Sequence, residues 1–140
     1  YQPFFTLHYY QTTGSFPRPE EGVCSCAQLK VEVDGQIEIT AGDGDGPVNA
    51  LDIALRRALE RFYPAVSKIT LVDFKERVLD GKSATASKVR VIIESTDGEA
   101  NWTTIGVSED MIQASWIALV DSFEYKLIRD IEKRYKRFNV

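Results

Sequence analysis

The sequence predicts an α+β fold built from a duplicated βββα unit, antiparallel sheets with two packed helices, within one domain of 140 residues. Residues 1–65 form the first expected repeat and residues 66–140 the second. Each half shows alternating apolar and polar stretches, followed by a stretch with apolar residues at helical spacing. Each half also has an Asp-Gly pair between two strands, at Asp34-Gly35 and Asp97-Gly98, which is a strong hairpin signal.

The first repeat begins with three strands, expected over Phe4 to Thr12, Ala27 to Val33 and Gln36 to Thr40. The third strand is predicted from the alternation of Ile37 and Ile39 with polar residues.

A glycine-rich stretch, Gly-Asp-Gly-Asp-Gly-Pro from Gly42 to Pro47, leads from this strand into a helix expected to reach about Phe62. Three glycines at alternate positions allow φ > 0 and the close approach of another group to the backbone. Pro47 suits the first helical position, since the N–H that it lacks has no intrahelical partner there. The outward-pointing N–H groups of such a helix start can hold a carboxylate or phosphate, so we expect a small anionic ligand or an interface here. An ordinary turn is the alternative, and Asp43 and Asp45 would repel a phosphate.

The second repeat has the same order, with strands expected over Ser67 to Leu79, Thr85 to Ser95 and Trp102 to Val107. A longer helix follows and is expected to end near Tyr135. Ser108 is its predicted N-cap, with Glu109 and Asp110 in the first turn, where negative charge is favourable.

Composition and cysteine usage exclude several functions. A net charge of −4 gives nucleic acid little to bind. No apolar run reaches the roughly 18 residues that cross a membrane. Cys24 and Cys26, two residues apart on a strand, are badly placed to pair with each other, and no second Cys/His pair completes a zinc site. We therefore expect reduced thiols, a cytoplasmic protein and no bound metal.

Catalytic residues are hard to find. His8 is the single histidine and has no evident nucleophile partner, so a serine or cysteine triad is unsupported. Lys88, Arg90 and Glu94 alternate with an apolar face and are expected on the outer face of a sheet. The sequence therefore favours a binding or regulatory module over an enzyme.

Four segments, taken in order, carry a resemblance to a known family: Gly44 to Ala50, Leu71 to Val78, Ala84 to Arg90 and Trp102 to Ser108. They resemble the LeuA-type allosteric and dimerisation domain, which ends the α-isopropylmalate synthases and citramalate synthases. The resemblance extends from about Leu7 to Arg129. The segments Ile112 to Trp116 and Leu119 to Leu127 look most like the citramalate synthase branch.

The resemblance implies a regulatory role. In that family a TIM-barrel domain condenses acetyl-CoA with a 2-oxo acid, using a divalent metal, and none of that barrel's motifs occurs in these 140 residues. The C-terminal domain binds leucine or isoleucine near its dimer interface and inhibits the enzyme. This chain is therefore expected to be a homodimeric fragment of a longer acyltransferase, with no catalytic activity or cofactor of its own.

The resemblance also implies an effector pocket lined by Gly44, Gly46, Pro47, Val48, Asn49, Leu71, Phe74, Val78, Ala84, Ala86 and Met111. The starts of both helices offer N–H groups for the carboxylate of an amino acid. Asp73 is the candidate partner of its ammonium group because it interrupts an apolar strand, and a turn or an inter-subunit salt bridge is the alternative. For Val48, Leu71 and Val78 the alternative is ordinary core packing. Phe74 departs from the tyrosine often found there and lacks its hydroxyl.

Two other interpretations stay open at this point. One is a dimerisation module of the same fold without a working effector site. The other is an unrelated α+β enzyme, for which the sequence offers no candidate nucleophile or base.

Overall fold

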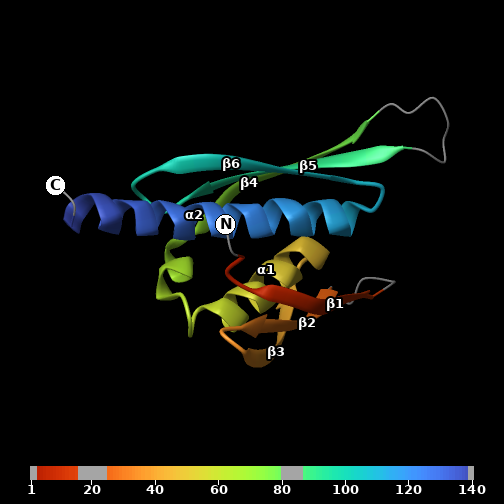
Figure 1. Cartoon of the computed structure of the whole chain (residues 1–140). Coiled ribbons are helices and arrows are strands. Elements are labelled where there is room, and N and C mark those ends of the chain that lie inside the picture. Colours follow the sequence, from red (N-terminus) through yellow and green to blue (C-terminus); the bar gives the residue numbers. More distant parts are fainter. Residues whose placement is uncertain (1–2, 16–24, 80–86, 139–140) are drawn as a thin grey trace. The chain divides into compact units, whose positions relative to one another are not determined.

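The computed structural model describes residues 3–15, 25–79 and 87–138. The chain divides into two compact units, Tyr1–Pro64 and Ala65–Val140. Each unit contains three antiparallel strands followed by a helix (Figure 1). The predicted α+β fold with a duplicated βββα unit is therefore confirmed.

The first unit consists of β1 (Thr6–Gly14), β2 (Ser25–Val33), β3 (Gln36–Gly44) and α1 (Pro47–Leu59). The strands form a sheet in the order β1-β2-β3, and α1 packs on β3 and β2. The third strand extends four residues beyond the expected end at Thr40, because its ladder with β2 continues until Gly44 pairs with Ser25.

The second unit repeats this arrangement. After a short 3-10 helix, η1 (Pro64–Lys68), come β4 (Thr70–Leu79), β5 (Lys88–Thr96), β6 (Asn101–Ser108) and α2 (Met111–Phe138). The sheet order is β4-β5-β6, and α2 packs on β6 and β5. The strand expected from Ser67 begins at Thr70 instead, since the residues before it form η1.

Both predicted hairpin turns are present. Asp34 and Gly35 between β2 and β3 have positive φ angles of 50° and 77°, and Gly98 between β5 and β6 has a φ of 89°. These left-handed conformations favour glycine and asparagine or aspartate, which explains Asp34, Gly35 and Gly98. Asp97 has no positive φ, and its carboxylate accepts the N–H groups of Glu99 and Ala100 instead.

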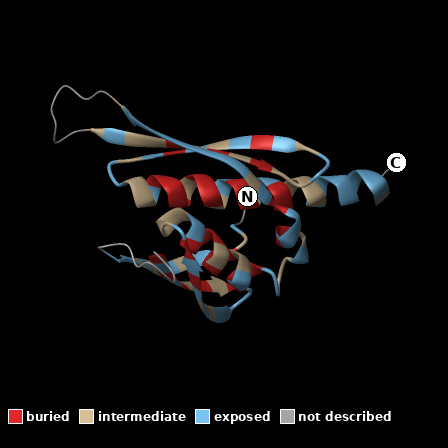
Figure 2. Cartoon of the chain, turned by 180° about the vertical axis from the view of Figure 1, so that it is seen from behind, coloured by how far each residue is buried: buried red, intermediate tan, exposed pale blue. Residues whose placement is uncertain are grey.

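The buried residues of each unit lie where the helix covers the sheet (Figure 2). In the first unit they include Ala27, Leu29, Val31 and Val33 of β2 and Leu51, Leu55 and Leu59 of α1. In the second they include Val91 and Ile93 of β5 and Ala114, Ala118 and Phe123 of α2. Ile37 and Ile39, which predicted β3 correctly, lie on the face that α1 leaves open and are 46% and 59% exposed.

The two units repeat one helix–strand contact in detail. Thr40 of β3 donates a hydrogen bond from its hydroxyl to the carbonyl of Ala54 in α1, at 2.7 Å. Thr104 of β6 donates the equivalent bond to the carbonyl of Ala118 in α2, also at 2.7 Å. Each pair spans 14 residues, and the second pair follows the first by 64 residues. The duplication expected from the sequence therefore extends to single hydrogen bonds.

Candidate functional site

The glycine-rich segment between β3 and α1 opens at the start of the helix. Gly46 is the N-cap, with extended backbone angles (φ −154°, ψ 175°), and no side chain caps the helix there. Pro47 occupies the first helical position, as predicted. The N–H of Ala50 donates to the carbonyl of Gly46 at 3.0 Å. The first N–H groups of a helix lack intrahelical partners, so those of Val48 and Asn49 remain available to a ligand.

The three glycines of this segment have different roles. A Cβ on Gly42 would lie 2.5 Å from the carbonyl oxygen of Ala50, and one on Gly44 would lie 2.7 Å from the amide nitrogen of Ala50. Neither glycine has a positive φ, so the expectation of left-handed turn geometry at these positions is wrong. Both are strand residues that let α1 approach β3 closely. At Gly46, in contrast, an added Cβ would meet no atom within 4 Å, so open space lies over the start of α1.

The start of α2 is closed by its own cap. The carboxylate of Asp110 accepts hydrogen bonds from the N–H groups of Ile112 at 2.7 Å and Gln113 at 3.2 Å. Asp110 is therefore the N-cap, and the prediction that Ser108 holds that position is wrong, because Ser108 still pairs with Val89 in the β6 ladder. Because these N–H donors are occupied, the start of α2 is a poorer site for a ligand carboxylate than the start of α1.

Asp73 lies beside an irregularity in β4. The register of β4 against β5 shifts between Leu71 and Asp73. The Asp73 carboxylate accepts a hydrogen bond from the N–H of Phe74 at 2.9 Å and lies 3.5 Å from the Lys75 ammonium nitrogen. The side chain is 45% exposed, so a ligand cation can reach the carboxylate beside Lys75.

The apolar side chains of β4 are unusually exposed. Val72 is 56%, Phe74 37% and Val78 65% exposed, while Leu71 is half-buried. Val78 is therefore not a core residue, and the core-packing alternative is wrong for it. The cause is topological: β4 is an edge strand, and α2 covers β6 and β5. Exposed apolar side chains gathered on one strand are typical of a binding or contact surface.

The implied pocket residues fall into two groups in the described structure. Those around the start of α1 are adjacent: Gly44, Gly46, Pro47, Val48 and Asn49. Those of the second unit are Leu71, Asp73, Phe74 and Val78 on β4 and the half-buried Met111 at the start of α2. Ala84 and Ala86 lie outside the described residues.

Cys26 has no sign of a redox or metal role. It is a free, exposed thiol on β2, and its Sγ donates to the Asp43 carboxylate at 2.9 Å. This hydrogen bond, with smaller contributions from desolvation and the Asp43 charge, raises the pKa of the Cys26 thiol, which makes it less nucleophilic. Among the described residues no group of three or more His, Cys, Asp or Glu side chains could hold a metal ion. Cys24 lies outside that part of the chain.

The sequence reasoning missed an apolar surface on the second sheet. Ile105 and Val107 of β6 are 50% and 43% exposed, on the side of the sheet that faces away from α2. Lys88, Arg90 and Glu94 lie on that same side, as expected. The available signal was Ile92, an apolar residue placed between Arg90 and Glu94 on the polar face of β5. No helix in the described residues is long and apolar enough to span a membrane.

Comparison with known proteins places this geometry in context. Residues 4–127 match the family described as the LeuA allosteric (dimerisation) domain. The chain is 46% identical over 130 residues to an (R)-citramalate synthase of Aquifex aeolicus, covering 93% of this chain and 25% of that protein. It is also 46% identical over 132 residues to an (R)-citramalate synthase of Geobacter sulfurreducens, with 94% and 25% covered. A 2-isopropylmalate synthase of Shewanella baltica is 30% identical over 118 residues, with 84% and 21% covered. The chain thus spans about a quarter of the length of these two citramalate synthases.

Proposed function

Because this chain belongs to the LeuA allosteric (dimerisation) domain family, we propose that it is the regulatory and dimerisation domain of an (R)-citramalate synthase and binds a branched-chain amino acid as feedback inhibitor. The identity of 46% to citramalate synthases, against 30% to a 2-isopropylmalate synthase, supports the citramalate branch. The effector is isoleucine or leucine. Family membership contradicts the third interpretation, an unrelated α+β enzyme.

The observation that carries the effector proposal is the uncapped start of α1. In the two repeats Gly46 and Asp110 occupy equivalent positions, since Ala50 and Ala114 donate to their respective carbonyls at 3.0 and 2.9 Å. Asp110 satisfies the helix start with its own carboxylate, whereas Gly46 has no side chain to do so. The carboxylate of a bound amino acid would take the place at α1 that Asp110 fills at α2, accepting from the N–H groups of Val48 and Asn49.

In the second unit, taken by itself, β4 carries residues of the kinds that an amino-acid effector also needs. The partly exposed carboxylate of Asp73 is the candidate partner of the ammonium group, and an inter-subunit salt bridge is the alternative for it. Phe74 and Val78, on the opposite face of β4 from Asp73, are the candidate apolar contacts of the effector's side chain. These assignments rest on the family resemblance together with the exposure of the residues.

The parent protein is proposed to carry a TIM-barrel domain that joins acetyl-CoA to a 2-oxo acid with a divalent metal. An effector that binds one arrangement of the dimer better than another shifts the population of the dimer. The attached catalytic domain then responds through the same coupling free energy, typically about 1–3 kcal/mol. We also propose a cytoplasmic location, which suits the free thiol of Cys26.

The second candidate function is a dimerisation module without a working effector site. The observation in its favour is that Asp45, directly before the α1 N-cap, is exposed and negatively charged, and would oppose an approaching carboxylate. Under this alternative the chain forms dimers but binds no amino acid.

Gly46→Leu separates the two candidates. The open space and extended backbone at Gly46 accommodate the new side chain without strain, but it would cover the N–H groups of Val48 and Asn49. Gly14→Leu is the matched control, because Gly14 also has no atom within 4 Å of an added Cβ. Calorimetric titration with isoleucine and leucine should show binding by the wild type and Gly14→Leu and its loss in Gly46→Leu, with all three dimeric by sedimentation. Unchanged binding by Gly46→Leu would refute the assignment of the carboxylate to α1.

A further inference from the structure

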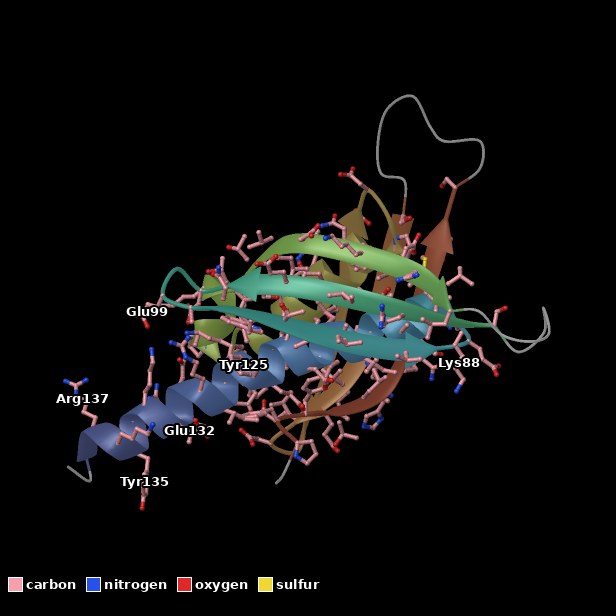
Figure 3. The ribbon with its side chains drawn as sticks, turned by 90° about the horizontal axis from the view of Figure 1, so that it is seen from above. Lys88, Glu99, Tyr125, Glu132, Tyr135 and Arg137 are labelled. Carbon is pink, nitrogen blue, oxygen red and sulfur yellow. The ribbon has the colours of Figure 1, made fainter. Side chains whose placement is uncertain are left out.

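The side of the β4-β5-β6 sheet that faces away from α2, called here the outer face, is arranged in cross-strand rows. Figure 3 looks onto this face, with Lys88 and Glu99 near its two ends. Three neighbouring rows, read from β4 through β5 to β6, are Asp73, Glu94 and Thr103; Lys75, Ile92 and Ile105; and Arg77, Arg90 and Val107.

Charge is segregated between these rows. The row of Asp73 and Glu94 carries two negative charges, and the row of Arg77 and Arg90 carries two positive charges. Like charges directly opposite each other in an antiparallel pair destabilise a sheet. In the described part of the chain neither arginine forms an ion pair, and the Nε of Arg90 is buried without a hydrogen-bond partner. Contacts among the described residues therefore leave the two arginines without a counter-charge, while of the acidic pair Asp73 has Lys75 at 3.5 Å.

The row between the two charged rows is largely apolar. Ile105 is 50% exposed and Ile92 is half-buried, and beside them Val107 is 43% exposed. A hollow of about 390 Å³ lies over this region, lined by Lys75, Glu76, Arg77, Arg90 and Ile92. Glu76 pairs with the buried Val91, so strand alternation directs its side chain to the opposite face. Acidic charge on the outer face is thus kept to the row of Asp73 and Glu94.

We propose that the outer face packs against the same face of a second copy of this chain, about a two-fold axis that runs across the strands at Ile92. This inference rests on the dimerisation role proposed above and specifies the surface that performs it. The axis places Ile92 opposite Ile92 of the second copy, Arg90 opposite its Glu94, and Arg77 opposite its Asp73. The four charges of the two outer rows are then met by opposite charges, around a centre that is apolar at Ile92 and Ile105.

The charge pattern selects this axis over the other simple one. A two-fold axis parallel to the strands would place Arg90 opposite Arg90 of the second copy and Glu94 opposite Glu94. Face-to-face sheets pack about 10 Å apart with their strands nearly aligned, so an antiparallel stacking of β5 on β5 has ordinary geometry. The same axis places Lys75 opposite Lys75 of the second copy. Because Lys75 lies on the edge strand, its ammonium group reaches solvent, and it pairs with Asp73 of its own chain.

The outer face of the β1-β2-β3 sheet lacks this self-complementarity. Its central row is Tyr9, Lys30 and Ile39, and one neighbouring row, Gln11, Gln28 and Ala41, is uncharged. A two-fold axis across these strands at Lys30 would therefore bring no opposite charges together. This sheet supplies a matched control position, Lys30, on the outer face of its central strand.

The test is a charge swap on β5, read by sedimentation velocity of the wild-type chain and its variants without effector. Arg90→Glu and Glu94→Arg should each raise the dimer dissociation constant at least about tenfold, because like charges then face each other. Mixing these two variants, or combining both substitutions in one chain, should restore the wild-type constant, which a misfolded variant could not do. Lys30→Glu should leave the dimer dissociation constant unchanged. Arg77→Glu with Asp73→Arg provides a second, independent pair on the exposed edge strand.

The outcomes separate this inference from the proposed function. A monomeric wild-type chain would overturn both. A wild-type dimer that neither Arg90→Glu nor Arg77→Glu weakens would overturn the assignment of the surface alone. The assignment of the surface would also be overturned if the single variants weakened the dimer but neither their mixture nor the double variant restored it.

Discussion

The hairpin between β5 and β6 is tied to α2 by a buried ion pair, which makes the stability of the second unit testable. The ammonium of Lys126 lies 2.6 Å from the Asp97 carboxylate, with side chains only 5% and 1% exposed. The other carboxylate oxygen accepts the N–H groups of Glu99 and Ala100, each at 2.9 Å. Four groups on one buried carboxylate, including Arg129 at 3.3 Å, fix the end of the sheet on the helix.

Lys126→Met keeps most of the side-chain volume and removes the charge. Breaking a buried pair by removing one partner costs about 3–5 kcal/mol, and here it leaves the buried Asp97 carboxylate with Arg129 at 3.3 Å as its one remaining cation among the described residues. For a chain of this size 1 kcal/mol shifts the melting temperature by roughly 3–4 °C, so we expect a drop of roughly 10–17 °C at pH 7 by differential scanning calorimetry. Glu99→Gln is the matched control: it breaks the Lys133–Glu99 pair between the same hairpin and helix. That pair is 47% and 69% exposed, and its loss should cost less than about 1 kcal/mol.

The same variant tests the pH dependence. Desolvation alone would raise the pKa of Asp97, but the hydrogen bonds from Lys126, Ala100 and Glu99 outweigh it and hold that pKa well below its ordinary value. A pKa lowered on folding contributes stability that is present above the unfolded value, about 3.9, and is lost as the pH falls below it. The difference in stability between the wild type and Lys126→Met should therefore shrink as the pH falls below about 4. Two results would refute the reasoning. One is a loss of melting temperature at pH 7 that is smaller for Lys126→Met than for Glu99→Gln. The other is a difference between the wild type and Lys126→Met that persists unchanged in acid.

The remaining predictions concern the helix–strand contacts of the repeats. Gly106→Ala should cost about 1–3 kcal/mol, because its Cβ would lie 2.9 Å from the Ala118 nitrogen and still closer to another backbone atom of α2. Gly14→Ala, with open space around it, should cost much less by denaturant titration. Asp110→Ala should cost about 0.5–2 kcal/mol through loss of the α2 cap, and equal stability of this variant and the wild type would contradict that assignment.

The fold was predictable from the sequence because its signals are local. The Asp-Gly pairs mark turns with left-handed backbone that few other residues adopt, and both turns have it, at Asp34 and Gly35 and at Gly98. The element ends were less predictable. Ser108 and Asp110 are both good N-caps, and the choice between them depends on how far the β6 ladder runs. Gly42 and Gly44 repeat with the period of a strand, but they were interpreted as a turn because their partner, α1, approaches only in the folded structure.

The candidate site was predictable in part. Pro47 marks the start of α1, and Gly46 leaves it uncapped, as the pattern indicates. The exposure of Phe74 and Val78 could not be predicted, because an apolar strand has the same sequence pattern at the edge of a sheet as at its centre. The outer face escaped notice for a similar reason, since its charge rows join residues from three strands that only the register brings together.

The central claim is that this domain binds a branched-chain amino acid. Its most direct test is calorimetric titration of the wild-type dimer with isoleucine, then leucine, with valine as control. We predict saturable binding, with isoleucine preferred over leucine as expected for the citramalate synthase branch. If neither isoleucine nor leucine bound to an intact dimer, the claim would be contradicted and the domain would be a dimerisation module.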